Sequence, residues 1–212
     1  MKKIPRSSLY FNKVKIWIQN FSIFSNHNNI LPLDLRVTRN NFYIISELLV
    51  QGSLRDLLCD QIRIHEKIAL SYLKQIAEAM NYAHKAKCLH LGLKPENIML
   101  KEGTVEITDF CMAELYQHSL EYYEATKPYM APECLKTRGK TEKCDVWSTG
   151  IIFFEMLYGK TPSEIRKKGL VFPEDMEIED CVKDLLRGML ELDKTKRLSF
   201  ELVLNHEALK GL

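Results

Sequence analysis

The clearest hydrophobic pattern in the chain lies in residues 65–87. Apolar side chains recur there at intervals of four, three, four and three residues, at Ala69, Leu73, Ile76, Met80 and Ala83. This spacing matches the period of about 3.6 residues of an α-helix that buries one stripe of its surface. The pattern therefore predicts a core helix and carries no functional signal of its own.

Two short apolar runs further along predict a β-hairpin. Ile98–Leu100 and Val105–Thr108 flank the tripeptide Lys101-Glu102-Gly103, and glycine can take the positive φ that a tight turn needs. The hairpin would present the polar loop His90–Asn97 at one end and Asp109 at the other. Polar side chains gathered in this way mark the stretch as the candidate site.

Length and composition bound the class of protein. The chain has 212 residues, enough for one sizeable domain, with 46% hydrophobic and 27% charged residues. A net charge of +2 points to neither a nucleic-acid nor a membrane partner. The six cysteines form no C-x-x-C pair, so we expect no zinc site and no disulfide framework, and a reducing cytoplasm fits best. No signal peptide is visible, and the apolar run Ile151–Phe154 is far too short to span a bilayer.

Residues 88–111 resemble two loops of the eukaryotic protein kinases, whose pattern is H-R-D-L-K-P-E-N followed by D-F-G. The matching positions are His90, Leu93, Lys94, Pro95, Glu96, Asn97, Asp109 and Phe110. Three positions depart from the pattern: Leu91 stands for Arg, Gly92 for the catalytic Asp, and Cys111 for Gly. The resemblance implies an α+β protein-kinase-like fold, with a β-rich small lobe and a mainly helical large lobe.

The resemblance also assigns roles to the loop residues. Lys94 would contact the transferred phosphate, as in Ser/Thr kinases, and Asn97 and Asp109 would be the two magnesium ligands. Gly92 has no side chain to accept the proton of a substrate hydroxyl, so efficient phosphoryl transfer is not expected. ATP and magnesium are therefore the implied cofactors, with their binding left open.

Residues 1–49 would be the remnant of the small lobe. Lys2 or Lys3 would stand for the nucleotide-binding Lys, and residues 11–25 for the helix that supplies its Glu partner. The first glycine is Gly52 and the first Glu is Glu47, so the sequence has neither the glycine-rich loop nor that helix Glu. Two strands are predicted at Leu31–Val37 and Phe42–Ser46. The chain from Glu47 to Leu49, together with Met99, would then meet an adenine.

Residues 50–212 would form a complete large lobe. The sequence Ala131-Pro132-Glu133 resembles the end of a kinase activation segment, and Asp145–Gly150 resembles the start of the buried central helix, which would stop at Gly159. In the family pattern Arg197 pairs with Glu133 in a buried bridge. His90, Glu133, Asp145 and Arg197 are thus expected to be structural.

The departures leave four functional interpretations open. The first is a pseudokinase that binds or regulates other proteins, and the second is a weakly active Ser/Thr kinase. The third is a mimic of a kinase large lobe, with a complete kinase as its candidate partner, and the fourth is a truncated fragment. Leu91 cannot receive a phosphorylated residue of the activation segment, so we expect no phosphorylation switch through that contact. We also expect an exposed apolar sheet edge around Phe42–Ile45, which a protein partner would cover.

Overall fold

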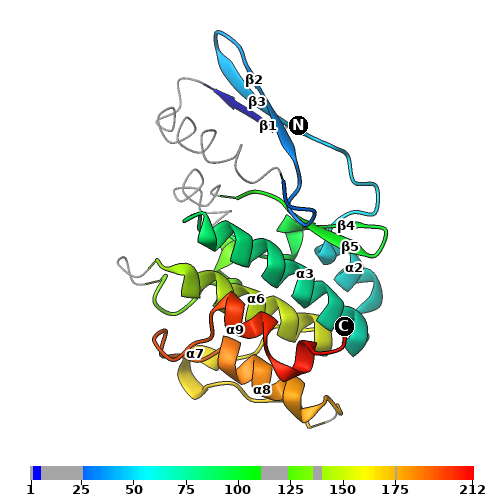
Figure 1. Ribbon diagram of the computed structural model, residues 1–212, viewed down its shortest axis with the longest axis vertical. Coiled ribbons are helices and arrows are strands. Elements are labelled where there is room, and N and C mark those ends of the chain that lie inside the picture. Colours follow the sequence, from blue (N-terminus) through cyan, green and yellow to red (C-terminus); the bar gives the residue numbers. More distant parts are fainter. Residues whose placement is uncertain (1, 6–25, 111–123, 136–139, 175) are drawn as a thin grey trace.

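The molecule consists of a small sheet at one end and a helical body at the other (Figure 1). The computed structural model describes residues 2–5, 26–110, 124–135, 140–174 and 176–212. Figure 1 shows the hairpin of β4 and β5 between the sheet and the helices. The predicted helix over residues 11–25 and Cys111 lie outside the described residues.

The described residues form two groups of strands and a set of α-helices and short 3-10 turns. The strands are β1 (Lys2–Pro5), β2 (Leu33–Val37), β3 (Asn41–Ser46), β4 (Ile98–Lys101) and β5 (Thr104–Ile107). The α-helices are α2 (Leu54–Gln61), α3 (Glu66–Lys85), α6 (Glu142–Tyr158), α7 (Ile165–Lys168), α8 (Asp180–Met189) and α9 (Phe200–Leu204). Short 3-10 turns occur at η1 (Pro95–Asn97), η2 (Lys127–Tyr129) and η3 (Glu207–Leu209).

The small sheet has the antiparallel order β1-β3-β2. Strands β2 and β3 confirm the two predicted strands to within two residues. The expected exposed edge at Phe42–Ile45 is wrong, because β3 is the central strand and is paired on both sides. Phe42 and Ile44 are accordingly buried on one face of the sheet.

Helix α3 confirms the prediction over residues 65–87. All five residues of its predicted stripe, from Ala69 to Ala83, are completely buried. The helix packs on α6, α9 and β5. Helix α6 is buried on all sides from Cys144 to Tyr158, which is the environment expected for a mostly apolar helix in the middle of a domain.

Two glycines end elements as predicted. In the β4–β5 turn, Glu102 and Gly103 have φ of 49° and 82°, the left-handed pair of a two-residue hairpin turn. Helix α6 ends at Gly159, whose φ is 69° and whose N–H donates to the carbonyl of Glu155. A Cβ at Gly159 would lie 2.7 Å from the carbonyl oxygen of Ile62, so this position also needs glycine for space.

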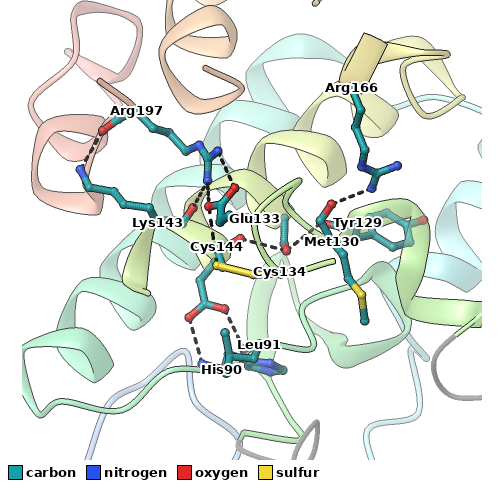
Figure 2. Close-up of a disulfide and its surroundings, with 12 residues drawn as sticks. His90, Leu91, Tyr129, Met130, Glu133, Cys134, Lys143, Cys144, Arg166 and Arg197 are labelled. Atoms are coloured by element: carbon teal, nitrogen blue, oxygen red, sulfur yellow. Dashed lines mark hydrogen bonds and ion pairs between the residues drawn. A yellow bond between two sulfur atoms is a disulfide. The ribbon is translucent and has the colours of Figure 1, made fainter. Parts of the chain in front are cut away.

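The prediction of no disulfide is wrong at one place. Cys134 and Cys144 form a disulfide between the segment after Glu133 and the first turn of α6 (Figure 2). The pair has no local signature, because the two cysteines are ten positions apart and only the fold returns the chain to α6. Within the described ranges, no helix is both long and apolar enough to cross a bilayer.

We predict that Gly159→Ala destabilises the protein more than Gly103→Ala. Both changes force an L-residue into the left-handed region, at about 1–2 kcal/mol, but only Gly159 also lacks room, since nothing lies within 4 Å of a Cβ at Gly103. The clash should add about 1–3 kcal/mol. Urea unfolding of the two variants measures the difference, and equal losses would show that the Ile62 contact imposes no constraint.

Candidate functional site

The polar loop His90–Asn97 is fixed to the core by Asp145, a residue near the start of α6. The Asp145 carboxylate accepts the backbone N–H of Leu91 at 2.7 Å on Oδ1 and that of His90 at 2.9 Å on Oδ2. His84 of α3 donates to Oδ2 through Nε2, also at 2.9 Å. The carboxylate is completely buried, so these donors replace the water that it has lost.

His90 links the loop to the end of β5. Its Nε2 donates to the carbonyl of Thr108 at 2.9 Å, and its Nδ1 accepts the N–H of Gly92 at 3.2 Å. These two bonds require the neutral ring with its proton on Nε2. Burial lowers the pKa of His90, against a smaller opposing effect of Asp145. The ring also contacts Phe110, with centroids 4.8 Å apart.

Gly92 occupies the point of the loop where the family pattern places its base. Its N–H is held by His90, and its carbonyl accepts Nδ2 of Asn97 at 2.8 Å. Lys94 follows and is only 7% exposed, and its carbonyl accepts the N–H of Asn97 at 2.9 Å. The loop is thus folded through its backbone and presents no carboxylate at position 92.

One backbone bond joins the two segments that carry the expected magnesium ligands. The N–H of Thr108 donates to the carbonyl of Asn97 at 3.0 Å, which puts Asp109 beside the loop. Because Nδ2 of Asn97 is used by Gly92, its Oδ1 is the atom left for a ligand. Amide and carboxylate oxygens fit Mg²⁺, which takes few protein ligands and completes its shell with water and phosphate. Among the described residues, no cluster of three or more His, Cys, Asp or Glu side chains offers an alternative metal site.

The expected adenine-facing residues are brought near β4. Met99 forms a bridge with Ser53, and the N–H of Leu100 donates to the carbonyl of Gly52 at 3.0 Å. Leu49 is buried, whereas Glu47 is exposed and its carboxylate pairs with Lys101 at 2.8 Å.

Lys2, the candidate nucleotide-binding lysine, lies in β1 opposite Ile44 of β3. Its side chain lies outside the part of the chain that the structure describes, so its expected role stays a prediction.

A buried ion pair joins Glu133 to Arg197 (Figure 2). The Arg197 side chain is completely buried, and Nη1 and Nη2 donate to the two carboxylate oxygens of Glu133 at 2.6 and 3.1 Å. Arg197 also donates to the carbonyls of Glu191 and Lys143, both at 2.8 Å, and lies 4.9 Å from the centre of the Trp147 ring. Arg197 thus links the segment at Glu133 to the first turn of α6 through the carbonyl of Lys143.

Sequence reasoning missed a second polar cluster beside the loop. Arg55 of α2 donates to Glu96 at 3.1 Å, to Glu155 at 2.9 Å and to the hydroxyl of Tyr129. The Tyr129 hydroxyl donates in turn to Glu155 at 2.7 Å, and burial followed by the charge of Glu155 raises the pKa of Tyr129. No local signal could have found this cluster, because its members lie on four different elements.

Arg166 is a further residue that the sequence did not single out. Its Nη2 donates to the carbonyls of Lys127, Pro128 and Met130, at 2.9, 3.1 and 2.6 Å. It therefore fixes the backbone of the segment that leads to Glu133.

Comparison with known proteins agrees with this geometry. The family model described as the protein kinase domain matches residues 16–209. Myosin light chain kinase A of Dictyostelium discoideum is 32% identical over 205 residues, covering 88% of this chain and 70% of that protein. Protein kinase kin1 of Schizosaccharomyces pombe is 32% identical over 187 residues, covering 82% of this chain and 21% of that protein. The calcium/calmodulin-dependent protein kinase cmkA of Emericella nidulans is 29% identical over 206 residues, covering 88% and 50%. The chain thus spans from about a fifth to 70% of the length of these relatives.

We predict that Glu133→Gln lowers the free energy of unfolding by about 3–5 kcal/mol, because it leaves the guanidinium of Arg197 buried without its counter-charge. The matched control is Glu164→Gln, which breaks an exposed pair with Lys168 and should cost less than about 1 kcal/mol. Urea unfolding measures both, and similar small losses would show that the buried bridge is not required.

We also predict that His90 makes stability depend on pH. A histidine whose pKa is lowered by folding stays neutral in the folded protein, while the unfolded chain takes up a proton below its ordinary pKa of 6.5. The contribution of neutral His90 to the free energy of unfolding should therefore be fully present above pH 6.5. It should fall as the pH drops towards 5.5, by at most about 1.4 kcal/mol per pH unit.

The measurement is urea unfolding from pH 7.5 to 5.5 for the protein and for His90→Gln. The variant should lose part of the slope, and the remainder includes His27, whose pKa burial also lowers. Replacement of the exposed His65 serves as the control. An unchanged slope in His90→Gln would contradict the assignment of a neutral, buried ring.

Proposed function

The chain belongs to the protein kinase domain family, and from this premise we propose that it is a pseudokinase, a kinase-fold domain impaired in phosphoryl transfer that acts by binding and regulating other proteins. The observation that supports this proposal is Gly92. It stands in a loop whose backbone is fully ordered by Asp145, His90 and Asn97, yet it has no group that could accept a proton.

The chemistry of the transfer explains why Gly92 matters. In protein kinases the catalytic-loop Asp accepts the proton of the attacking hydroxyl and orients it. The backbone groups of Gly92 cannot substitute, because its N–H and its carbonyl are both engaged within the loop. Loss of a positioned base lowers the rate by about 10²–10⁴-fold, before the absence of a Glu in residues 11–25 is considered.

We further propose that the protein retains ATP and magnesium binding. Lys94, Asn97 and Asp109 supply the phosphate contact and the two oxygen ligands that this chemistry uses. When bound, Mg²⁺ would neutralise phosphate charge next to Asp109. The same three residues favour the second candidate function, a weakly active Ser/Thr protein kinase, and relatives such as the probable serine/threonine-protein kinase KCC4 of Saccharomyces cerevisiae agree with that substrate class.

A protein partner is the remaining part of the proposal. Leu48 and Val50, directly after β3, are 84% and 90% exposed, so the segment that joins the sheet to the helices offers apolar surface for association. A complete kinase is the candidate partner, as in the large-lobe mimic considered above. We place the protein in the cytoplasm, where the ATP that the family uses is abundant.

We predict a magnesium-dependent rise in the unfolding temperature with ATP. Ligand at 100 times its Kd stabilises a protein by about 2.7 kcal/mol, a shift of several degrees for a domain of this size. Asp109→Ala should abolish the shift. A folded sample whose unfolding temperature does not rise would contradict nucleotide binding. Protein binding would then be the only part of the proposed function that stands.

Phosphate transfer to a peptide mixture then separates the two candidate functions. The unchanged protein should show no transfer, and Gly92→Asp should restore it if the remaining groups are intact. Gly92→Asn is the matched control, since it has the shape of Asp without the base. Transfer by the unchanged protein at about 1–100 s⁻¹, the ordinary kinase range, would overturn the pseudokinase proposal.

A further inference from the structure

The Cys134–Cys144 disulfide lies between two polar centres of the large lobe (Figure 2). Cys134 directly follows Glu133, which is bonded to Arg197, and Cys144 directly precedes Asp145, which holds the backbone of His90 and Leu91. One covalent bond therefore joins the neighbour of Glu133 to the neighbour of Asp145, the residue that orders the candidate loop.

The two cysteine residues differ in their exposure to solvent. Cys144 is 2% exposed, whereas Cys134 is only partly buried. A small thiol or disulfide can therefore reach Cys134 first, with Cys144 placed to complete the exchange. Three other described cysteines form no disulfide: Cys59 is exposed, Cys88 is buried and Cys181 is partly buried.

The chain between the two cysteines is strongly basic. Residues 135–143 contain Lys136, Arg138, Lys140 and Lys143 and one acidic residue, Glu142. A basic segment of this kind attracts an anionic reagent, whereas a described group beside the buried sulfur is acidic, with Oε1 of Glu133 3.7 Å from Sγ of Cys144. The low-molecular-weight disulfide that fits this charge is glutathione disulfide, whose peptide carboxylates make it anionic.

We propose that Cys134 and Cys144 form a reversible thiol–disulfide site that exchanges with glutathione and thereby sets how firmly the His90–Asn97 loop is held. In the reduced protein the Cys134 thiolate attacks one sulfur of glutathione disulfide, which forms a mixed disulfide and releases one glutathione thiolate. The Cys144 thiolate then attacks the Cys134 sulfur and releases the second. Two protein thiols are oxidised, one glutathione disulfide is reduced to two glutathione molecules, and the two protons end on these.

The mechanical consequence follows from the connections of α6. In the oxidised protein, the residue after Glu133 is tied to the first turn of α6, and Asp145 in that same turn accepts the amides of His90 and Leu91. Reduction frees the segment after Glu133 and leaves the first turn of α6 with its hydrogen bonds alone. This proposal depends on the proposed function only where it treats the His90–Asn97 loop as a ligand site. The thiol–disulfide exchange itself needs neither a nucleotide nor a protein partner.

The test equilibrates the full chain with a series of glutathione and glutathione disulfide mixtures and counts oxidised cysteines by differential alkylation and mass spectrometry. We expect Cys134 and Cys144 to convert together and in both directions, while Cys59 and Cys181 form no intramolecular bond. A pair that stays oxidised across the whole series would be a static structural bond, and a pair that never forms the bond would exclude the site; either result overturns the proposal.

Hydrogen exchange of the His90 and Leu91 amides reads out the coupling. Exchange should be at least about tenfold faster in the reduced protein, since closing a short loop stabilises a fold by more than that factor. Cys134→Ser should exchange at the reduced rate in every mixture, and Cys59→Ser should behave as the unchanged protein. Equal exchange in the two redox states would refute the coupling.

A charge variant tests the choice of reagent. Lys136→Glu combined with Arg138→Glu should slow oxidation by glutathione disulfide but leave oxidation by the neutral reagent hydroxyethyl disulfide less affected. Equal slowing by both reagents would contradict the electrostatic selection. All these readouts omit ATP, so failure of nucleotide binding and failure of the redox site are separate outcomes.

Discussion

The buried carboxylate of Asp145 is the constraint on which the rest of the candidate site depends. It has lost all contact with water, and it receives donors from two places: the ring of His84 on α3 and the backbone of His90 and Leu91 in the loop. A buried charge of this kind is stable only while those donors stay in position. Because α6 is surrounded by the core, the position of Asp145 is fixed. The loop must therefore adopt the conformation that places the N–H groups of His90 and Leu91 against its carboxylate.

This arrangement separates the shape of the loop from its chemistry. The bonds that fold the loop use backbone groups, the ring of His90 and the amide of Asn97, and none of them involves a side chain at position 92. Glycine can therefore replace the aspartate of the family pattern at position 92 without breaking any of the hydrogen bonds that fold the loop. The loop is preserved as a structure even though the group that would accept a proton is missing.

Local sequence patterns predicted the elements whose reasons are local. The stripe of α3, the Glu102-Gly103 turn and the end of α6 at Gly159 each follow from periodicity or from a required positive φ. The disulfide and the cluster around Arg55 could not be predicted in this way, since each is made by residues that only the tertiary fold brings together. The supposed exposed edge at β3 failed for the same reason: which strand is central depends on pairing with β1, and no pattern within β3 reveals it.

Asn97 and Asp109, which both match the family pattern near Gly92, do not support nucleotide binding equally. Asn97 has a structural reason to be there, because its amide holds the carbonyl of Gly92 whether or not a metal is present. Asp109 is different. It sits at φ 65°, in the left-handed region that Asp tolerates better than most residues, at the exit of β5 beside the Asn97 backbone. An asparagine would satisfy that conformation equally well, so the conformation alone does not require the negative charge at Asp109. Of the two residues only Asp109 brings a negative charge, so a substitution at Asp109, rather than at Asn97, is the one that separates a nucleotide-binding pseudokinase from a scaffold without a ligand.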